Sequence, residues 1–573
     1  MILFSTKRHW LAVCLGLLVF CTIGLPFTKW WLAGGDDFHC MYLADKTTTW
    51  RELLSFFADG NAGKDDGATN FIRTPGTTTF FATYYRPIHM IIYTLLYWLF
   101  GINGYAFFLV NVLLHALNTV LLFYLLRLFG SSFTACIGAL LFAYHPQIAY
   151  RFGLIAFIQY YLSTLCILAM LLMWRRYLRY RNNLVLIALA LLFFVTLFVR
   201  ESVIVLPAIL FMSMYLYPPE KTISLKKYFR ATLIPLIIVS SMAVVFCLIR
   251  LTLYPFELTV PIITPLYINI SKLSFSKIQE VLVCMYDCLW LSWLPWGQKL
   301  FRLIITIPLI SLLFLLFTYN KKKLWILTCL SSALLMLWPG IIGCYSPRYF
   351  YEAAPFILLA YTFLVTYYQG PGKKYHKSLQ VISIGTIIFL IWFVYAGLKG
   401  RELKMYNAQQ AITCLLNNPT IKNKPLCFLS YPEDCFGNYQ PAEICWVLMQ
   451  DYSIPIFCDP TVSLIQADAN IVTPTKWMNI ISKHYDRNYL SIVPVPGGFH
   501  YTSQNPNKIN FAIPKKYAGS LGKKTVHKTC LINNTSVVTD FTLLIDKQYS
   551  NTEPIYIWWD YATKSFKTMP STP

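Results

Sequence analysis

Apolar runs close to the length of a membrane span recur along the first 398 residues of this chain. A helix needs about 20 predominantly apolar residues to cross the hydrocarbon core of a bilayer. Residues 105–129, 152–173 and 378–398 are examples of such runs. Of the 573 residues, 57% are hydrophobic and only 13% are charged, which excludes an ordinary soluble protein. The sequence therefore predicts a multi-pass α-helical membrane protein.

The net charge of +23 has a simple explanation in a membrane protein. In a soluble domain it would suggest binding to nucleic acid. Here most basic residues cluster in short segments between apolar runs, where the positive-inside rule accounts for them. No nucleic-acid partner is therefore expected. The clusters occupy residues 7–8, 175–181, 221–230, 321–323 and 373–377.

The basic clusters also predict the topology. Residues 10–27 are expected to form an uncleaved first span, since no small-residue cleavage site follows them. Residues 7–8 place the N-terminus in the cytoplasm, so the polar loop after the first span is outside. The short apolar segment at 87–102 decides the rest. If it lies on the outer side without crossing, every basic cluster is cytoplasmic, and the chain has about 11 spans.

This topology places several charged and polar residues on one side of the membrane. Taken singly, each has an ordinary explanation: Arg200 and Glu201 could pair at a helix end, and His145, followed by a proline, could end a helix. Their shared side instead predicts one outward-facing cavity. The residues that share this side are Asp36, Asp37, Arg86, His145, Arg200, Glu201 and Arg348.

The character of the chain changes near residue 400. Asn, Pro, Lys and Asp become more frequent, and apolar runs shorten to strand length, as at 426–429 and 555–559. We therefore expect two domains. Residues 1–399 form the transmembrane domain, in which 28–103 contribute an outer loop and juxtamembrane helices. Residues 400–573 form a soluble α/β or α+β domain on the outer side.

The order of several motifs resembles the GT-C class of polyprenyl-phosphate-sugar-dependent glycosyltransferases. It is most similar to the membrane half of the TPR-bearing transmembrane O-mannosyltransferases and their bacterial relatives, although no TPR array is present. The resemblance covers roughly residues 10–210. It rests on Asp36-Asp37, Tyr85-Arg86-Pro87-Ile88, Phe100-Gly101-Ile102-Asn103-Gly104-Tyr105, Leu109-Val110-Asn111-Val112-Leu113-Leu114-His115 and Leu141-Phe142-Ala143-Tyr144-His145-Pro146. Further along the chain, Ser346-Pro347-Arg348-Tyr349-Phe350-Tyr351 resembles the family's Arg-Tyr-Leu-Tyr element near the last spans.

The resemblance implies an inverting transfer of a sugar from a polyprenyl-phosphate donor to an acceptor hydroxyl. By motif match Asp36 is the general base and Asp37 assists it, because a positioned carboxylate can remove the acceptor's proton. Arg86 and Arg348 are candidates for binding the donor phosphate. Supporting or acceptor-binding roles fall to Tyr85, His145, Arg200 and Glu201. A divalent metal held by the acidic pair remains an alternative, but without a third convincing ligand no metal is assigned.

Two other functions stay open from the sequence. The chain could be a lipid-linked sugar flippase or transporter, or a non-catalytic scaffold on the same fold. Transporters place charges at the bilayer midplane and often contain inverted repeats, whereas here the charges gather at one surface and no repeat is visible. The expected partners are the lipid-linked donor, membrane lipid and a protein, glycan or lipid acceptor. The expected location is the bacterial inner membrane, or the endoplasmic reticulum of a eukaryote, with the site facing the periplasm or lumen.

Overall fold

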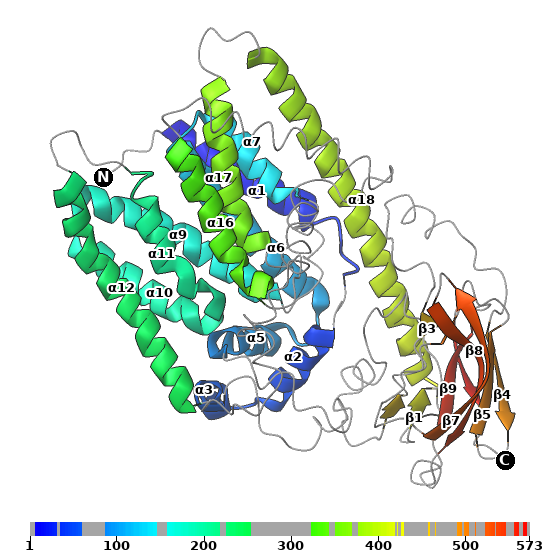
Figure 1. The fold of residues 1–573 in the computed structure, drawn as a ribbon. Helices are drawn as coiled ribbons and strands as arrows, with labels where there is room; N and C mark the ends of the chain where they lie inside the picture. The colour runs from blue at the N-terminus through cyan, green and yellow to red at the C-terminus, as the bar shows by residue number, and fades with distance from the viewer. Residues whose placement is uncertain are drawn as a thin grey trace.

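The computed structural model shows helices up to residue 416 and strands beyond it (Figure 1). It describes residues 6–30, 35–59, 86–145, 157–217, 225–253, 323–342, 350–368, 376–418 and 421, and then the strands between 426 and 569. Four shorter helices form the N-terminal part. They are α1 (Thr6–Ile23), α2 (Gly35–Lys46), α3 (Trp50–Asp59) and α5 (Pro87–Phe100).

The helices that follow make up the body of the protein. They are α6 (Gly104–Arg127), α7 (Ser132–Ala143), α9 (Ile158–Tyr180), α10 (Asn183–Val199), the 3-10 helix η3 (Glu201–Val205), α11 (Leu206–Ser213), α12 (Leu225–Leu253), α16 (Lys323–Ile342), α17 (Phe350–Tyr368) and α18 (His376–Leu416).

Four of the described helices are long and apolar enough to cross a membrane: Gly104–Arg127, Ile158–Tyr180, Thr232–Arg250 and Ser383–Leu403. Seven shorter apolar helices accompany them among the described residues. The chain is therefore an integral membrane protein. The number of about 11 spans remains a prediction, because part of the helical region lies outside the described residues.

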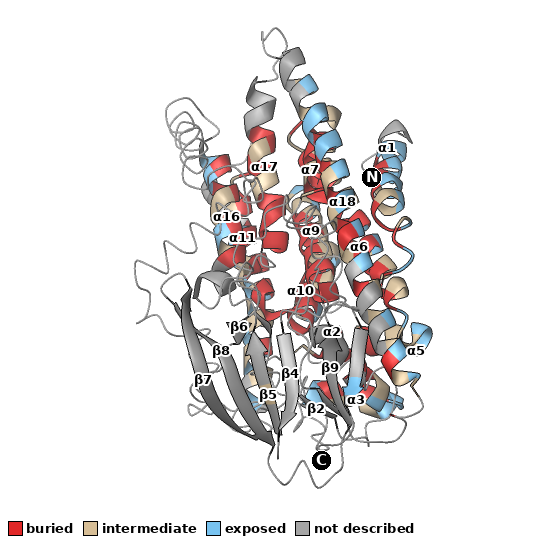
Figure 2. Ribbon diagram, turned by 90° about the vertical axis from the view of Figure 1, so that its right-hand side faces the viewer, coloured by how far each residue is buried: buried red, intermediate tan, exposed pale blue. Residues whose placement is uncertain are grey.

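Burial divides the helices into inner and outer faces (Figure 2). The central helix α6 packs against α1, α7 and α9. Its aromatic residues Phe107, Phe108 and Phe123 are at most 1% exposed. The outer faces remain apolar, as on α12, where Ile234 is 67% exposed. Apolar outer faces are expected where the surrounding solvent is lipid rather than water.

The short helix α5 begins and ends where its sequence predicts. Pro87 occupies the first turn, where no backbone N–H is needed for the helix. Gly101 ends it with a φ of 58°, a conformation that glycine adopts without steric cost. With 14 residues, α5 is shorter than a typical span.

The helix α3 is amphipathic and capped. The backbone N–H groups of Thr48 and Thr49 donate to the Glu52 carboxylate at 2.8 and 3.1 Å, and these bonds lower the pKa of Glu52. The face that carries Leu53 is buried, whereas Trp50 is 66% and Leu54 60% exposed. An exposed apolar face of this kind is typical of a helix lying in the membrane interface.

The last helix, α18, has 41 residues and is about 60 Å long at 1.5 Å per residue. It continues through the expected domain boundary at 399/400, so that boundary lies within a helix. The backbone N–H of Lys29, just beyond α1, donates to Glu402 Oε1 at 2.7 Å. Lys399 pairs with Glu402 Oε2 at 2.5 Å. Glu402, itself 2% exposed, therefore fixes α18 to the end of α1.

The strands beyond α18 form two sheets. In the first, of order β10-β9-β1-β2, β1 is parallel to both neighbours and β9–β10 are antiparallel. The second has the order β3-β6-β8-β5-β4 with β7 also on β8, and all of its pairings are antiparallel. The strands are β1 (Leu426–Phe428), β2 (Ile456–Cys458), β3 (Leu464–Ile465), β4 (Leu490–Val495), β5 (Gly498–Ser503), β6 (Asn510–Phe511), β7 (Gly522–Ile532), β8 (Thr535–Ile545), β9 (Ile555–Asp560) and β10 (Ser565–Met569).

Candidate active site

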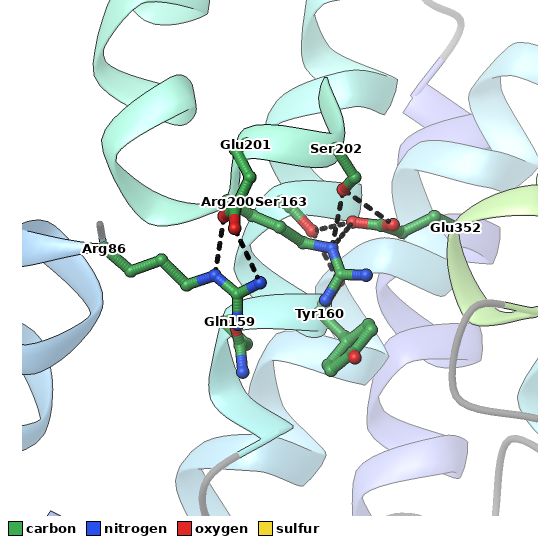
Figure 3. A network of polar contacts seen from close by, with 8 residues as sticks. All are labelled: Arg86, Gln159, Tyr160, Ser163, Arg200, Glu201, Ser202 and Glu352. Carbon is green, nitrogen blue, oxygen red and sulfur yellow. Dashed lines mark hydrogen bonds and ion pairs between the residues drawn. The ribbon is translucent and has the colours of Figure 1, made fainter. Parts of the chain in front are cut away.

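Two arginines and two glutamates meet at the ends of four helical segments (Figure 3). Arg86 precedes α5, Arg200 and Glu201 join α10 to η3, and Glu352 lies in the first turn of α17. We refer to these four residues as the charged cluster. Segments far apart in the sequence thus contribute to one polar site.

The Arg86 guanidinium makes a two-point contact with Glu201. Nε lies 2.6 Å from Oε2, and Nη2 lies 3.0 Å from Oε1. Nη1 donates to Gln159 Oε1 at 2.9 Å. Because the planar guanidinium matches a carboxylate in this geometry, the Arg86 side chain is held in one orientation.

The Arg200 guanidinium is more deeply buried, at 1% exposure. Its Nε lies 2.8 Å from Glu352 Oε1 and 2.7 Å from Ser202 Oγ. Its Cζ stands 3.6 Å from the centre of the Tyr160 ring, which adds a cation–π contact. Ser163 Oγ donates to Glu352 Oε1 at 2.5 Å. Hydrogen bonds from Ser163 and to Ser202 therefore add to the buried ion pair.

The local backbone explains why two adjacent residues have different partners. Arg200 ends α10 in an extended conformation, with φ −161° and ψ 119°. Successive side chains point to opposite sides of an extended backbone. Arg200 consequently reaches Glu352, whereas Glu201 turns toward Arg86.

A second polar group supports the first turn of α17. His115 Nε2 lies 3.2 Å from the carbonyl oxygen of Ala143, so this nitrogen donates. In the neutral ring Nδ1 then accepts from Tyr351 Oη at 2.7 Å. Asn118 Nδ2 donates to Tyr351 Oη at 3.0 Å and to the carbonyl oxygen of Tyr161 at 2.8 Å. These bonds fix Tyr351, the residue directly before Glu352.

The acidic pair predicted to be catalytic lies at the start of α2. Asp36 and Asp37 are in its first turn, and their side chains lie outside the described residues. The far end of α2 is joined to α5, because Tyr97 Oη donates to Asp45 Oδ1 at 2.6 Å. The helix that carries the acidic pair is therefore anchored to the helix that follows Arg86.

The remaining predicted residues are placed as follows. The structure brings Arg86, Arg200 and Glu201 into the charged cluster. His145, directly after α7, packs its ring on Phe350 at 4.7 Å between centroids. Tyr85 and Arg348 lie outside the described residues.

Sequence reasoning missed Glu352, Gln159 and Ser163. Glu352 could have been found, because a carboxylate within an apolar run of membrane-span length is costly unless it has a partner. Gln159 and Ser163 gave no comparable signal, since uncharged polar residues are common in such segments. Among the described residues, no group of three His, Cys, Asp or Glu side chains could hold a metal ion.

No family model and no curated protein matches this chain. Among solved structures it is similar to ArnT from Cupriavidus metallidurans bound to undecaprenyl phosphate, with 12% identity and a TM-score of 0.45. For the apo state of the same protein the identity is 12% and the TM-score 0.43. Both alignments cover 86% of this chain and 96% of the other. Similarity at this level does not establish a shared fold or activity.

Proposed function

We propose that this chain is a membrane glycosyltransferase of the GT-C type. It transfers a sugar from a polyprenyl-phosphate donor to an acceptor hydroxyl, with inversion at the anomeric carbon. The observation that carries the proposal is the convergence of Arg86, Arg200, Glu201 and Glu352 at the ends of helices in an integral membrane protein. The motif order around Asp36-Asp37 and Tyr85-Arg86-Pro87 supports it.

The chemistry assigns a separate task to each group. The Asp36 carboxylate removes the proton of the acceptor hydroxyl as its oxygen attacks the anomeric carbon. The bond to the donor phosphate oxygen breaks, and negative charge grows on the departing lipid phosphate. Asp37 orients its neighbour. Fixed cations are needed where that charge develops, and Arg86 and Arg348 supply them in this proposal.

The charge balance of the cluster explains why a second phosphate-binding cation is needed. Arg86 and Arg200 are matched by Glu201 and Glu352, so the four side chains together are neutral. In this proposal Glu201 orients Arg86, and Arg348, four residues before Glu352 in the sequence, supplies a further positive charge. His145, Arg200 and Tyr85 have supporting or acceptor-binding roles in this proposal.

The test compares two carboxylates of the same helix. Asp36→Asn keeps the shape of the side chain but not its basicity, so sugar transfer should fall by about 10² or more. Asp45→Asn is the matched control, since its amide oxygen still accepts from Tyr97 Oη. Purified variants are compared for transfer from a radiolabelled polyprenyl-phosphate sugar and, separately, for donor binding.

The outcomes separate the alternatives. Full transfer by Asp36→Asn removes this residue from the mechanism. Equal and complete loss in Asp36→Asn and Asp37→Asn indicates a metal shared by the pair. If the protein moves lipid-linked sugar from one leaflet of a vesicle membrane to the other and forms no transfer product, it is a flippase instead.

A further inference from the structure

The end of α9 remote from the charged cluster carries four arginines: Arg175, Arg176, Arg179 and Arg181. The helix has 23 residues and is about 34 Å long at 1.5 Å per residue, so its two ends lie at opposite faces of a bilayer. No acidic residue occurs between Asp66 and Glu201 in the sequence. The stretch of sequence that surrounds these arginines therefore carries no acidic side chain, and Glu220, the first acidic residue after Glu201, lies outside the described residues.

Three tyrosine rings, those of Tyr177, Tyr217 and Tyr228, pack against these arginines, and we refer to them as the floor. The guanidinium carbon of Arg181 lies 5.5 Å from the centre of the Tyr177 ring and 5.7 Å from that of Tyr228. That of Arg175 lies 5.9 Å from the Tyr217 ring. Arg–aromatic contacts at these distances orient the guanidinium plane while leaving its donors in place.

The floor is built from α9, α12 and the turn after α11, and hydrogen bonds and ring stacking hold it in place. Tyr228, in the first turn of α12, is 4% exposed and donates its hydroxyl to the carbonyl oxygen of Tyr217 at 2.7 Å. Tyr217 stacks on Phe129 at 5.6 Å. Tyr177 is 6% exposed and stacks on the fully buried Trp174 at 5.8 Å. The arginines thus stand at a junction of α9 with α12, rather than on an unstructured loop.

Two of the arginines are open to the surroundings. Arg176 and Arg179 are exposed, and Arg179 stands 5.3 Å from the ring of Tyr180, which is 47% exposed. Within the described part of the chain, no carboxylate forms an ion pair with Arg175, Arg176 or Arg179. At a membrane face, the abundant anion at this depth is the phosphodiester of an anionic phospholipid.

We propose that Arg175, Arg176, Arg179 and Arg181, on the floor formed by Tyr177, Tyr217 and Tyr228, bind the headgroup of an anionic phospholipid. The leaflet is the one opposite the charged cluster. The guanidinium groups donate to the phosphodiester oxygens, and Tyr180 lies at the level of the headgroups, where tyrosines are favoured. The phosphate chemistry is that of a bidentate arginine site.

This proposal differs from the general preference for positive charge on the cytoplasmic side. That preference requires only charge, so lysine would serve equally. A site that donates paired N–H groups to a phosphodiester requires arginine, because lysine offers a point charge. The two explanations therefore predict different results for a conservative substitution.

The experiment measures lipid binding to the purified full chain by native mass spectrometry. The probes are dioleoyl phosphatidylglycerol and tetraoleoyl cardiolipin, with dioleoyl phosphatidylcholine as the zwitterionic comparison. Arg176→Gln/Arg179→Gln should weaken binding of both anionic lipids at least tenfold. Binding of phosphatidylcholine should change much less, because the choline cation already pairs with its phosphodiester. Arg176→Lys/Arg179→Lys should recover only part of that loss. Arg51→Gln, which removes an exposed arginine from the amphipathic helix α3, is the comparison and should weaken anionic-lipid binding much less than the double variant does.

Three results would overturn the proposal. The first is unchanged binding of the anionic lipids by the double glutamine variant. The second is full recovery by the double lysine variant, since charge alone would then suffice. The third is displacement of the lipids by sn-glycerol 3-phosphate at millimolar concentration, which would identify a site for a soluble anion. None of these measurements requires glycosyl transfer, so the result is independent of the proposed enzymatic activity.

Discussion

Arginines lie beside both ends of α9, in opposite environments. At the first end, beside Tyr160, Arg200 is 1% exposed and pairs with Glu352, which is fully buried. At the second end Arg176 and Arg179 are exposed, and they lie beside ordered tyrosines without a carboxylate partner in the described chain. The first environment neutralises charge inside the protein, whereas the second presents charge to what surrounds it.

This difference predicts how much stability is lost when a charged residue is removed at each end of α9. Removing one member of a buried ion pair leaves the other charge desolvated, which is much more costly than loss of an exposed charge. Exposed arginines contribute little to stability, because water or lipid headgroups solvate them whether or not they have a partner. Arg200 should therefore serve mainly to hold the helices and its neighbours in place. Arg176 and Arg179 should serve mainly to bind an anionic ligand.

The largest effect is expected at Glu352. Glu352→Ala leaves Arg200 buried beside Tyr160 without its carboxylate, so the free energy of unfolding should fall by about 3–5 kcal/mol. Denaturant unfolding in mixed micelles measures this. Arg200→Met/Glu352→Leu is the control and should be closer to the parent than the single variant, because it buries no charge. If Glu352→Ala lowers the free energy of unfolding by less than about 1 kcal/mol, the buried pair tolerates loss of a charge as well as the exposed arginines at the other end of α9 do.

A smaller effect is expected at the partly exposed pair. Glu201→Gln removes the charge that faces Arg86, which is 13% exposed, so about 1–3 kcal/mol of stability should be lost. Restoring the carboxylate in a shorter form, Glu201→Asp, should recover part of it if geometry matters. Equal losses at Glu201 and Glu352 would mean that burial does not control the cost of breaking these pairs.

At the opposite end of α9 the floor should matter more than the charges above it. Tyr228→Phe keeps the ring beneath Arg181 but removes the hydrogen bond to the Tyr217 carbonyl oxygen. We expect a loss of about 0.5–1.5 kcal/mol in the same unfolding assay. Tyr228→Ala removes the buried ring as well and should cost more.

The smallest effect on stability is expected for Arg179→Gln, within about 0.5 kcal/mol of the parent. Its role in lipid binding predicts a change in affinity without a change in unfolding measured in lipid-free micelles. A large destabilisation there would contradict the contrast between the two ends of α9.

The helical part of the fold could largely be predicted, because membrane-span length and apolar composition are local properties of the sequence. The segment that begins at Pro87 was expected to be short, and α5 has 14 residues. The domain boundary expected at 399/400 remains a prediction, although the helix α18 runs through that position. The change in composition near residue 400 does not end the helix, because Lys399, Arg401 and Glu402 are residue types that favour helices, and α18 continues to Leu416.

The candidate site could be predicted from the sequence only in part. Topology indicated that Arg86, Arg200 and Glu201 share one side of the membrane, but their partners depend on three-dimensional geometry. Adjacent Arg200 and Glu201 suggested a pair with each other, whereas the extended backbone between α10 and η3 directs them to different segments. Glu352, 152 residues beyond Arg200, could be paired with it only once α9, α10 and α17 were packed together.

The order in which the ribosome makes these segments gives the buried pair a further significance. Arg200 is synthesised and enters the membrane with α10, well before Glu352 follows at the start of α17. Until then, Arg200 has no carboxylate from α17, and a nascent chain that stops before residue 352 never supplies one. Assembly of the helical part is therefore completed late, when α17 has been synthesised and Glu352 pairs with Arg200. Truncated chains are correspondingly expected to be substrates for membrane quality control.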